Sequence, residues 1–187
     1  GAEIVTADVV RVDFSGAEKV VYTDVGEFAA RGVVLATGAA AARLGIAREQ
    51  ELTGDGVSYC STCDGRFYKG ADVAVAGGTV KAIHDARYLS GLCNKVYVVS
   101  ETALESDLAT LSNVEVIENA EIVRLVGSPL SSVTVRAAAG ERELAVSGVF
   151  VARGFTPFSA PFKDAVALDE RGFITVDPVT MRTSAAG

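Results

Sequence analysis

The residues that decide the fold are 71–100, "ADVAVAGGTVKAIHDARYLSGLCNKVYVVS". The run at 71–78 is apolar apart from Asp72 and ends in two glycines, as expected of a strand buried on both faces. Four apolar residues follow at helical spacing: Ala82, Ile83, Ala86 and Leu89. Residues 94–100 again predict a strand. One β-α-β unit of this kind predicts an α/β, Rossmann-like fold with a parallel sheet and a right-handed crossover.

Most of the remaining chain also predicts strands. Extended, largely apolar runs occur at 3–14, 19–23 and 32–39, and the last ends in Thr-Gly, like a strand buried on both faces. Residues 102–113 predict a second helix. Beyond them, short strands separated by turn residues predict a β-meander that continues to residue 153.

The composition excludes several classes of protein. With 187 residues, 49% of them hydrophobic, the chain is expected to fold around a buried core. A net charge of −7 argues against a nucleic-acid or anionic-membrane surface. We find no run of 18 apolar residues and no signal peptide, and we expect a cytoplasmic protein. Three cysteines are too few for a secreted disulfide scaffold.

Two cysteines stand close together in "VSYCSTCDGRFYKG", residues 57–70. If Cys60 and Cys63 begin a short helix, they share one face, with Cα atoms roughly 5–6 Å apart and within disulfide reach. A helix amino terminus also lowers a thiol pKa and favours a nucleophilic thiolate. Asp64 is adjacent and could carry a proton to or from a leaving thiolate. This arrangement favours redox chemistry.

Two other interpretations of the cysteine pair stay open. A zinc site needs four ligands, and the other candidates are His84 and Cys93. At about 100° per residue these two lie on opposite faces of the predicted helix and converge poorly on one ion. The pair could also be two inert thiols. We therefore expect no metal, and we interpret His84 as a solvated helix residue and Cys93 as a thiol without a role.

The glycine-rich turn matches a dinucleotide-binding fingerprint only in part. In the pattern G-x-G-x-x-G/A, Gly77 and Ala82 match the first and last positions, with Gly78 between, but Thr79 replaces the second glycine. We expect the Thr79 side chain to point where a phosphate would sit. Glu101 follows the next strand and could bind a ribose 2′-hydroxyl, and no basic pair is present there for a 2′-phosphate. Nucleotide binding and a plain β-α-β turn both remain open.

These residues together carry a resemblance to a known family. The stretch "GVSYCSTCDGRFYKGADVAVAGG", residues 56–78, resembles the active-site region of the low-molecular-weight thioredoxin reductases, flavoproteins with a C-A-T-C-D-G motif. The stretches "VVLATGA", "DARYLSGLCNKVYVV", "GVFVARGFTPFSAPF" and "GFITVDPVTMRTSAAG" resemble other parts of the same proteins. The resemblance covers essentially the whole chain and is most specific at 56–65.

The resemblance implies a flavin-dependent disulfide oxidoreductase. Reduced FAD would pass two electrons to the Cys60–Cys63 disulfide, with Cys63 facing the flavin, Cys60 attacking the partner's disulfide and Asp64 acting as acid and base. Thr37 and Gly38 would lie beside the flavin dinucleotide, and Gly154 in the return segment would also belong to the cofactor-binding residues. The implied partner is a thioredoxin-like protein or a small disulfide, and the implied parent is a homodimer.

The chain also departs from the family pattern. The family's basic run His-Arg-Arg falls on Ser100, Glu101 and Thr102, and Thr79 replaces a fingerprint glycine, so NADPH is doubtful. Ferredoxin or a reduced deazaflavin, or NADH held through Glu101, are alternative donors, and a small-dithiol oxidase or a non-catalytic binding module are alternative functions.

No flavin-type G-x-G-x-x-G precedes residue 71. We therefore expect a central fragment that alone binds no FAD and catalyses no turnover. Residues 1–50 would be a flavin-domain remnant, 51–153 an NAD(P)H-type domain with the C-x-x-C motif, and 154–187 the return to the flavin domain.

Overall fold

The computed structural model describes residues 1–187, which form two compact units. One unit is Ala41–Phe155, and the other combines Gly1–Ala40 with Thr156–Gly187. We call them the redox unit and the terminal unit. The boundaries expected from the sequence, at 50–51 and 153–154, concern the family's domains and stay a prediction.

The redox unit is built on a five-stranded parallel sheet in the order β5-β12-β6-β7-β8. Its strands are β5 (Val57–Ser58), β6 (Asp72–Ala76), β7 (Lys95–Val99), β8 (Val114–Ile117) and β12 (Gly148–Val151). Helix α2 (Val80–Ser90) connects β6 to β7, and these strands pair from Asp72↔Lys95 to Ala76↔Val99. The β-α-β unit predicted from residues 71–100 is therefore confirmed.

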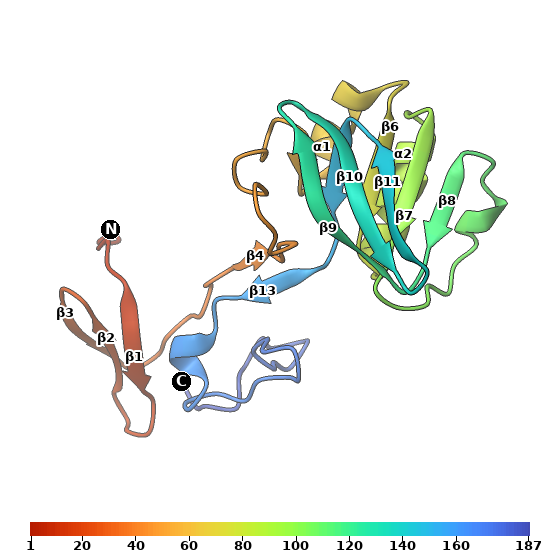
Figure 1. Cartoon of the computed structure of the whole chain (residues 1–187). Coiled ribbons are helices and arrows are strands. Elements are labelled where there is room, and N and C mark those ends of the chain that lie inside the picture. The colour runs from red at the N-terminus through yellow and green to blue at the C-terminus, as the bar shows by residue number, and fades with distance from the viewer. The chain divides into compact units, whose positions relative to one another are not determined.

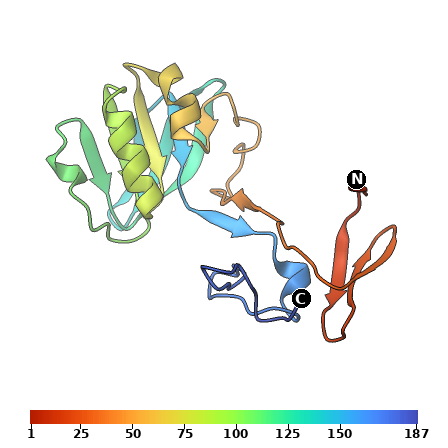
Figure 2. The same cartoon turned by 180° about the vertical axis from the view of Figure 1, so that it is seen from behind.

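A three-stranded antiparallel sheet lies on the face of the parallel sheet opposite α2 (Figures 1 and 2). Its strands are β9 (Ala120–Gly127), β10 (Leu130–Ala137) and β11 (Gly140–Ala145). The predicted meander is thus confirmed for these three strands. The strands on either side of it, β8 and β12, belong instead to the parallel sheet.

Alternating strand residues divide the interior into two cores. Val73 and Val75 of β6 pack with α2, whereas Ala74 and Ala76 pack with the antiparallel sheet. This division follows from the two-residue period of a strand, which points successive side chains to opposite faces. Burial on both faces explains why β6 is a nearly continuous apolar run in the sequence.

The terminal unit contains a three-stranded antiparallel sheet, β1-β2-β3. Its strands are β1 (Val9–Asp13), β2 (Lys19–Thr23) and β3 (Gly26–Ala30). A separate two-stranded sheet pairs β4 (Ala39–Ala41) with β13 (Phe155–Pro157). The only helical segment in the terminal unit is the 3-10 turn η3 (Ala160–Phe162).

Two predicted strands are wrong in whole or in part. The buried strand expected at 32–39 is absent, and Val34 is 92% exposed. The Val33 N–H bonds to the Gly187 carbonyl, but no strand pairs along 32–38, so the apolar run has no sheet to enter. The strand expected at 3–14 is confined to β1, and β3 was not predicted.

The helix predicted at 102–113 is also wrong. Only the 3-10 turn η2 (Leu108–Thr110) forms there. The hydroxyl of Thr110 donates to the Asp107 carbonyl at 2.7 Å, and the hydroxyl of Ser100 donates to the Thr102 carbonyl at 2.7 Å. Short polar side chains compete in this way with helical backbone bonds, which overrides the apolar spacing. Elsewhere, no helix is long and apolar enough to span a membrane.

Candidate active site

The two cysteines of the C-x-x-C motif form a disulfide. Helix α1 (Ser61–Asp64) begins directly after Cys60, which is its N-cap, and Cys63 lies in the same turn. Their Cα atoms are 5.3 Å apart, and the Cys63 N–H faces the Cys60 sulfur at 3.2 Å. The predicted short helix and the predicted Cys60–Cys63 disulfide are both present. Cys60 is half-buried and Cys63 is exposed.

Asp64 is held next to this disulfide by a serine from the parallel sheet. Ser58, at the end of β5, is buried and donates its hydroxyl to Asp64 Oδ2 at 2.6 Å. The same Ser58 oxygen accepts the N–H of Cys60 at 3.1 Å. One buried hydroxyl therefore fixes both the first cysteine and the predicted acid–base residue. The sequence analysis did not identify Ser58.

The segment that leads into the motif is fixed by a buried carboxylate. Glu49 accepts the Leu44 N–H at 2.8 Å, the Gly45 N–H at 2.9 Å and the Tyr59 hydroxyl at 2.8 Å. Burial raises the pKa of Tyr59, and its bond to Glu49 raises that pKa further. Tyr59 thus remains a neutral donor, and it holds the residue before Cys60 in place.

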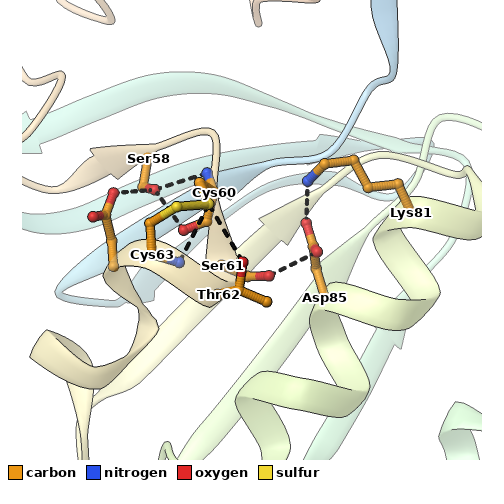
Figure 3. The surroundings of a disulfide bond; sticks show 8 residues. Ser58, Cys60, Ser61, Thr62, Cys63, Lys81 and Asp85 are labelled. Atoms are coloured by element: carbon orange, nitrogen blue, oxygen red, sulfur yellow. Dashed lines mark hydrogen bonds and ion pairs between the residues drawn. A yellow bond between two sulfur atoms is a disulfide. The ribbon is translucent and has the colours of Figure 1, made fainter.

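The residue after Cys60 is also held, in this case by helix α2. Ser61 donates to the carboxylate of Asp85 at 2.7 Å, and Lys81 pairs with the same carboxylate from one turn earlier in α2 (Figure 3). Lys81 is therefore part of a half-buried ion pair. His84 is exposed, as expected, and Arg87 pairs with Asp107.

The structure offers no arrangement that would hold a metal ion. No group of three or more His, Cys, Asp or Glu side chains is placed to share one. Cys93 is buried, and burial raises the pKa of its thiol to about 11. A thiol with that pKa stays protonated at neutral pH, whereas zinc binds the thiolate.

The glycine-rich turn lies at one end of β6, beside a pocket of about 290 Å³. Gly77 and Gly78 line this pocket together with Thr79, Glu101 and Arg153. A Cβ on Gly77 would lie closer than 3.0 Å to the Ala152 carbonyl oxygen, and one on Gly78 would lie equally close to the Ser100 hydroxyl. Gly77 is therefore required by the packing of the turn, because its neighbour is backbone, whereas a side chain at Gly78 would require the Ser100 hydroxyl to move.

The hydroxyl of Thr79 is bound within the turn, and the expectation that its side chain points where a phosphate would sit stays a prediction. This hydroxyl donates to the Ala152 carbonyl at 2.9 Å and accepts the Ala82 N–H at 3.4 Å. Thr79 is thus the N-cap of α2, and it satisfies one amide that a phosphate would otherwise bind. Ala82 is fully buried against the sheet and does not line the pocket.

Glu101 is engaged by a residue that the sequence analysis missed. Arg153 pairs with its carboxylate at 2.6 Å and also donates to the carbonyls of Arg43 and Leu44 at 3.2 and 3.1 Å. Glu101 and Arg153 are 52 residues apart, so no local pattern signals the pair. The neighbouring Gly154 accepts the Ala42 N–H at 2.9 Å and does not line the pocket.

Thr37 and Gly38 lie in the terminal unit, where they line a cavity of about 1000 Å³. Most of its other lining residues are apolar, among them Val33, Leu35 and Ile174. A dinucleotide also needs unpaired amides for its pyrophosphate, usually at a helix amino terminus. The terminal unit contains no α-helix, so residues 1–40 and 156–187 fit a ring system better than a pyrophosphate.

The comparison with known families agrees with this site. The family model described as "Pyridine nucleotide-disulphide oxidoreductase" matches residues 1–187. The chain belongs to this family. Two relatives align with the whole chain: the thioredoxin reductase of Streptomyces clavuligerus, with 35% identical residues, and that of Rickettsia conorii, with 36%. The chain spans 62% and 65% of their lengths, slightly under two thirds.

Solved structures of this oxidoreductase family show the same fold. The thioredoxin reductase of Giardia duodenalis matches the whole chain, 65% of its own length, with a TM-score of 0.85 and 30% identity. That of Streptococcus pyogenes matches 96% of the chain and 62% of its own length, with a TM-score of 0.79 and 29% identity. A ferredoxin-flavin thioredoxin reductase from Clostridium acetobutylicum matches 99% of the chain and 62% of its own length, with a TM-score of 0.55 and 28% identity.

Proposed function

We propose that the chain carries the redox disulfide of a thioredoxin reductase-like disulfide oxidoreductase. The observation that carries this proposal is the Cys60–Cys63 disulfide, with Asp64 held beside it by the buried hydroxyl of Ser58. The family membership and the thioredoxin reductases among the relatives support it. The proposed acceptor is a thioredoxin-like protein, with a small disulfide as the alternative.

The proposed reaction is a thiol–disulfide exchange that moves two electrons. In the reduced chain, the Cys60 thiolate attacks one sulfur of the acceptor disulfide, and the other sulfur leaves as a thiolate. Asp64 is proposed to take up the proton that the Cys60 thiol loses and to pass it to this leaving thiolate. Cys63 then attacks Cys60, which releases the second acceptor thiol and restores the Cys60–Cys63 disulfide. The acceptor is reduced by two electrons and the chain is oxidised by two.

Reduced flavin is the proposed source of these electrons in the whole protein, since it supplies two at once when bound. Thr37 and Gly38 are proposed to lie beside its ring system. The terminal unit offers no amide cradle for the pyrophosphate of a flavin dinucleotide. We accordingly propose that residues 1–187 alone hold no FAD and do not turn over. The homodimeric state stays a prediction.

The electron donor that reduces such a flavin is proposed to be something other than NADPH. Thr79 caps α2, Arg153 engages Glu101, and no basic pair stands where a 2′-phosphate would bind. Similarity to a protein named ferredoxin-flavin thioredoxin reductase supports a ferredoxin donor, and a reduced deazaflavin is an alternative. NADH held by Glu101 is the second candidate, and it would have to displace Arg153 from that carboxylate.

A single-turnover experiment tests the proposed exchange without any cofactor. The chain is reduced with dithiothreitol, freed of the reagent, and mixed with a small excess of oxidised thioredoxin. We expect close to one acceptor disulfide reduced per chain, and none with the Cys60→Ser or Cys63→Ser variants. Failure of the reduced wild-type chain to reduce either thioredoxin or a small aromatic disulfide would favour the non-catalytic binding module instead.

A further inference from the structure

Helix α2 reaches the redox motif through one buried carboxylate. Ser61, directly after Cys60, is 2% exposed, and its hydroxyl donates to Asp85 Oδ1 at 2.7 Å. Asp85 is 8% exposed, and its second oxygen pairs with Lys81. Figure 3 shows Ser61 and Lys81 reaching the Asp85 carboxylate from two directions. We call Ser61, Asp85 and Lys81 the α2 anchor.

The position of Asp85 is unusual for a charged residue. It occupies the buried face of α2, beside Ala82, Ala86 and Leu89. Burying a carboxylate costs free energy unless it is paired and hydrogen-bonded, so an apolar residue would be the simpler choice there. Its partners are a lysine of its own helix and one residue of another element, and that residue is the neighbour of Cys60.

Helix α1 needs such support more than most helices do. It has four residues, too few to be stable on its own, because forming the first turn of a helix is unfavourable. The separation of the two sulfurs is set by the conformation of this one turn. Ser61 is its only buried residue, and its bond to Asp85 ties the turn to helix α2. The bond from Ser58 to Asp64 ties the same turn to the parallel sheet.

We propose that Asp85 is a positioning residue for the Cys60–Cys63 dithiol–disulfide pair, acting through the hydroxyl of Ser61 with Lys81 as its counter-charge. The anchor holds Cys60 where Cys63 reaches it, and this raises the effective concentration of each sulfur for the other. It thereby favours closure of the intramolecular disulfide, the step that releases the reduced acceptor. The inference rests on the proposed function for its biological meaning, but not for its test.

The test is the redox equilibrium of the chain itself. Wild type, Ser61→Ala, Asp85→Asn and the double variant are equilibrated with mixtures of reduced and oxidised dithiothreitol, trapped with an alkylating reagent and counted by mass. We expect Ser61→Ala to lower the equilibrium constant for disulfide formation by about fivefold, the size of one lost charge-assisted hydrogen bond. Asp85→Asn should also lower this equilibrium constant. The double variant should lower it no further than Ser61→Ala alone does.

The matched control is Arg87→Met, which removes another ion pair of α2, the exposed one with Asp107. It should leave the equilibrium constant within about twofold of wild type, since exposed pairs contribute little. An unchanged constant in Ser61→Ala, a shift toward the disulfide, or additive effects in the double variant would each overturn the proposal. Circular dichroism establishes that each variant is folded, and Ser61→Ala keeps the test open if Asp85→Asn does not fold.

This experiment separates the two proposals. A chain whose equilibrium responds to the anchor but never reduces thioredoxin supports the positioning role and contradicts the proposed function. A chain that reduces thioredoxin stoichiometrically but is indifferent to Ser61→Ala has the proposed function without the anchor.

Discussion

The guanidinium of Arg153 and the carboxylate of Glu101 form an ion pair across the pocket beside the glycine-rich turn, with Nη2 and Oε1 2.6 Å apart. The carboxylate that we proposed as a partner for a ribose hydroxyl is thus paired with a residue of the same chain. The pair is half-exposed, so its own strength is modest. Its importance lies in the competition it sets up with any nucleotide.

We therefore predict weak or undetectable binding of NADPH and NADH to this chain. A bidentate arginine contact to phosphate is among the stronger polar interactions, and its loss should cost about 2–3 kcal/mol, or roughly 50-fold in affinity. Calorimetry with both nucleotides measures this. Arg153→Met, which frees Glu101, should improve NADH binding and leave NADPH unchanged. Micromolar NADPH binding by the wild-type chain would contradict the prediction.

The second prediction concerns the backbone of the same turn. Gly77→Ala should destabilise the fold by about 2–4 kcal/mol, because its Cβ would overlap the Ala152 carbonyl and because φ is +147°. Gly140→Ala is the matched control, with φ +122° and no atom within 4 Å of a new Cβ. Urea unfolding of both variants isolates the overlap from the backbone strain. Equal losses in the two variants would show that the overlap contributes nothing.

Local patterns predicted the elements whose stability is local. A pattern of about ten residues was enough to predict each of three elements: the buried strand β6, the helix α2 and the C-x-x-C turn. The segment 32–39 carries an equally strong strand pattern, but a central strand forms only where neighbours pair with it, and none does here. Pairing partners are a property of the whole sheet, and a local pattern cannot reveal them.

The candidate site divides in the same way. Cys60, Cys63 and Asp64 are adjacent in sequence and could be found there, with their geometry. The role of Asp85 could not be predicted in this way, because Asp85 is 24 residues from Ser61. The pair of Arg153 and Glu101, beside the glycine-rich turn, could not be predicted either, because it joins residues 52 apart. An aspartate on the apolar face of α2 was the one available signal. It breaks the helical pattern at a position where a buried charge needs a partner.

The third prediction concerns thiol accessibility. Mild reduction of the native chain should expose two thiols, those of Cys60 and Cys63, whereas Cys93, 7% exposed, should react only after unfolding.

Burial raises the pKa of Cys93 to about 11, so its neutral form is favoured in the folded state. The contribution of the neutral Cys93 thiol to the free energy of unfolding is fully present below the ordinary thiol pKa of about 8.5, and it is lost as pH rises through about 11. Urea unfolding at pH 8 and pH 10.5 should show this loss in wild type and a smaller one in Cys93→Ala.

The fourth prediction assigns the two sulfurs. If Cys60 attacks the acceptor, then Cys63→Ser leaves that attack intact and blocks the resolving step, so a mixed disulfide with thioredoxin accumulates. Cys60→Ser should trap far less, by about tenfold or more over the same interval. A resolving-cysteine variant of thioredoxin, activated with an aromatic disulfide, serves as the acceptor. Cys63 is the more exposed residue of the two, and accumulation of the mixed disulfide in Cys60→Ser instead would exchange the two proposed roles.

The last prediction concerns the bond from Ser58 to Asp64. Asp64→Asn removes the proposed proton donor, and it should slow single-turnover reduction of thioredoxin by about 10²-fold at pH 7. Ser58→Ala keeps the carboxylate but frees it from its 2.6 Å bond, so we expect a smaller loss of rate, about three- to tenfold.

Comparing two acceptors separates an effect on proton transfer from an effect on the fold of the motif. A disulfide whose leaving thiolate is already stable, such as an aromatic one, needs no proton, so both variants should reduce it at nearly the wild-type rate. Ser90→Ala is the control, since its exposed hydroxyl bonds only the Arg87 carbonyl of its own helix. Equal slowing with both acceptors would mean that Ser58 and Asp64 hold the motif in shape and move no proton.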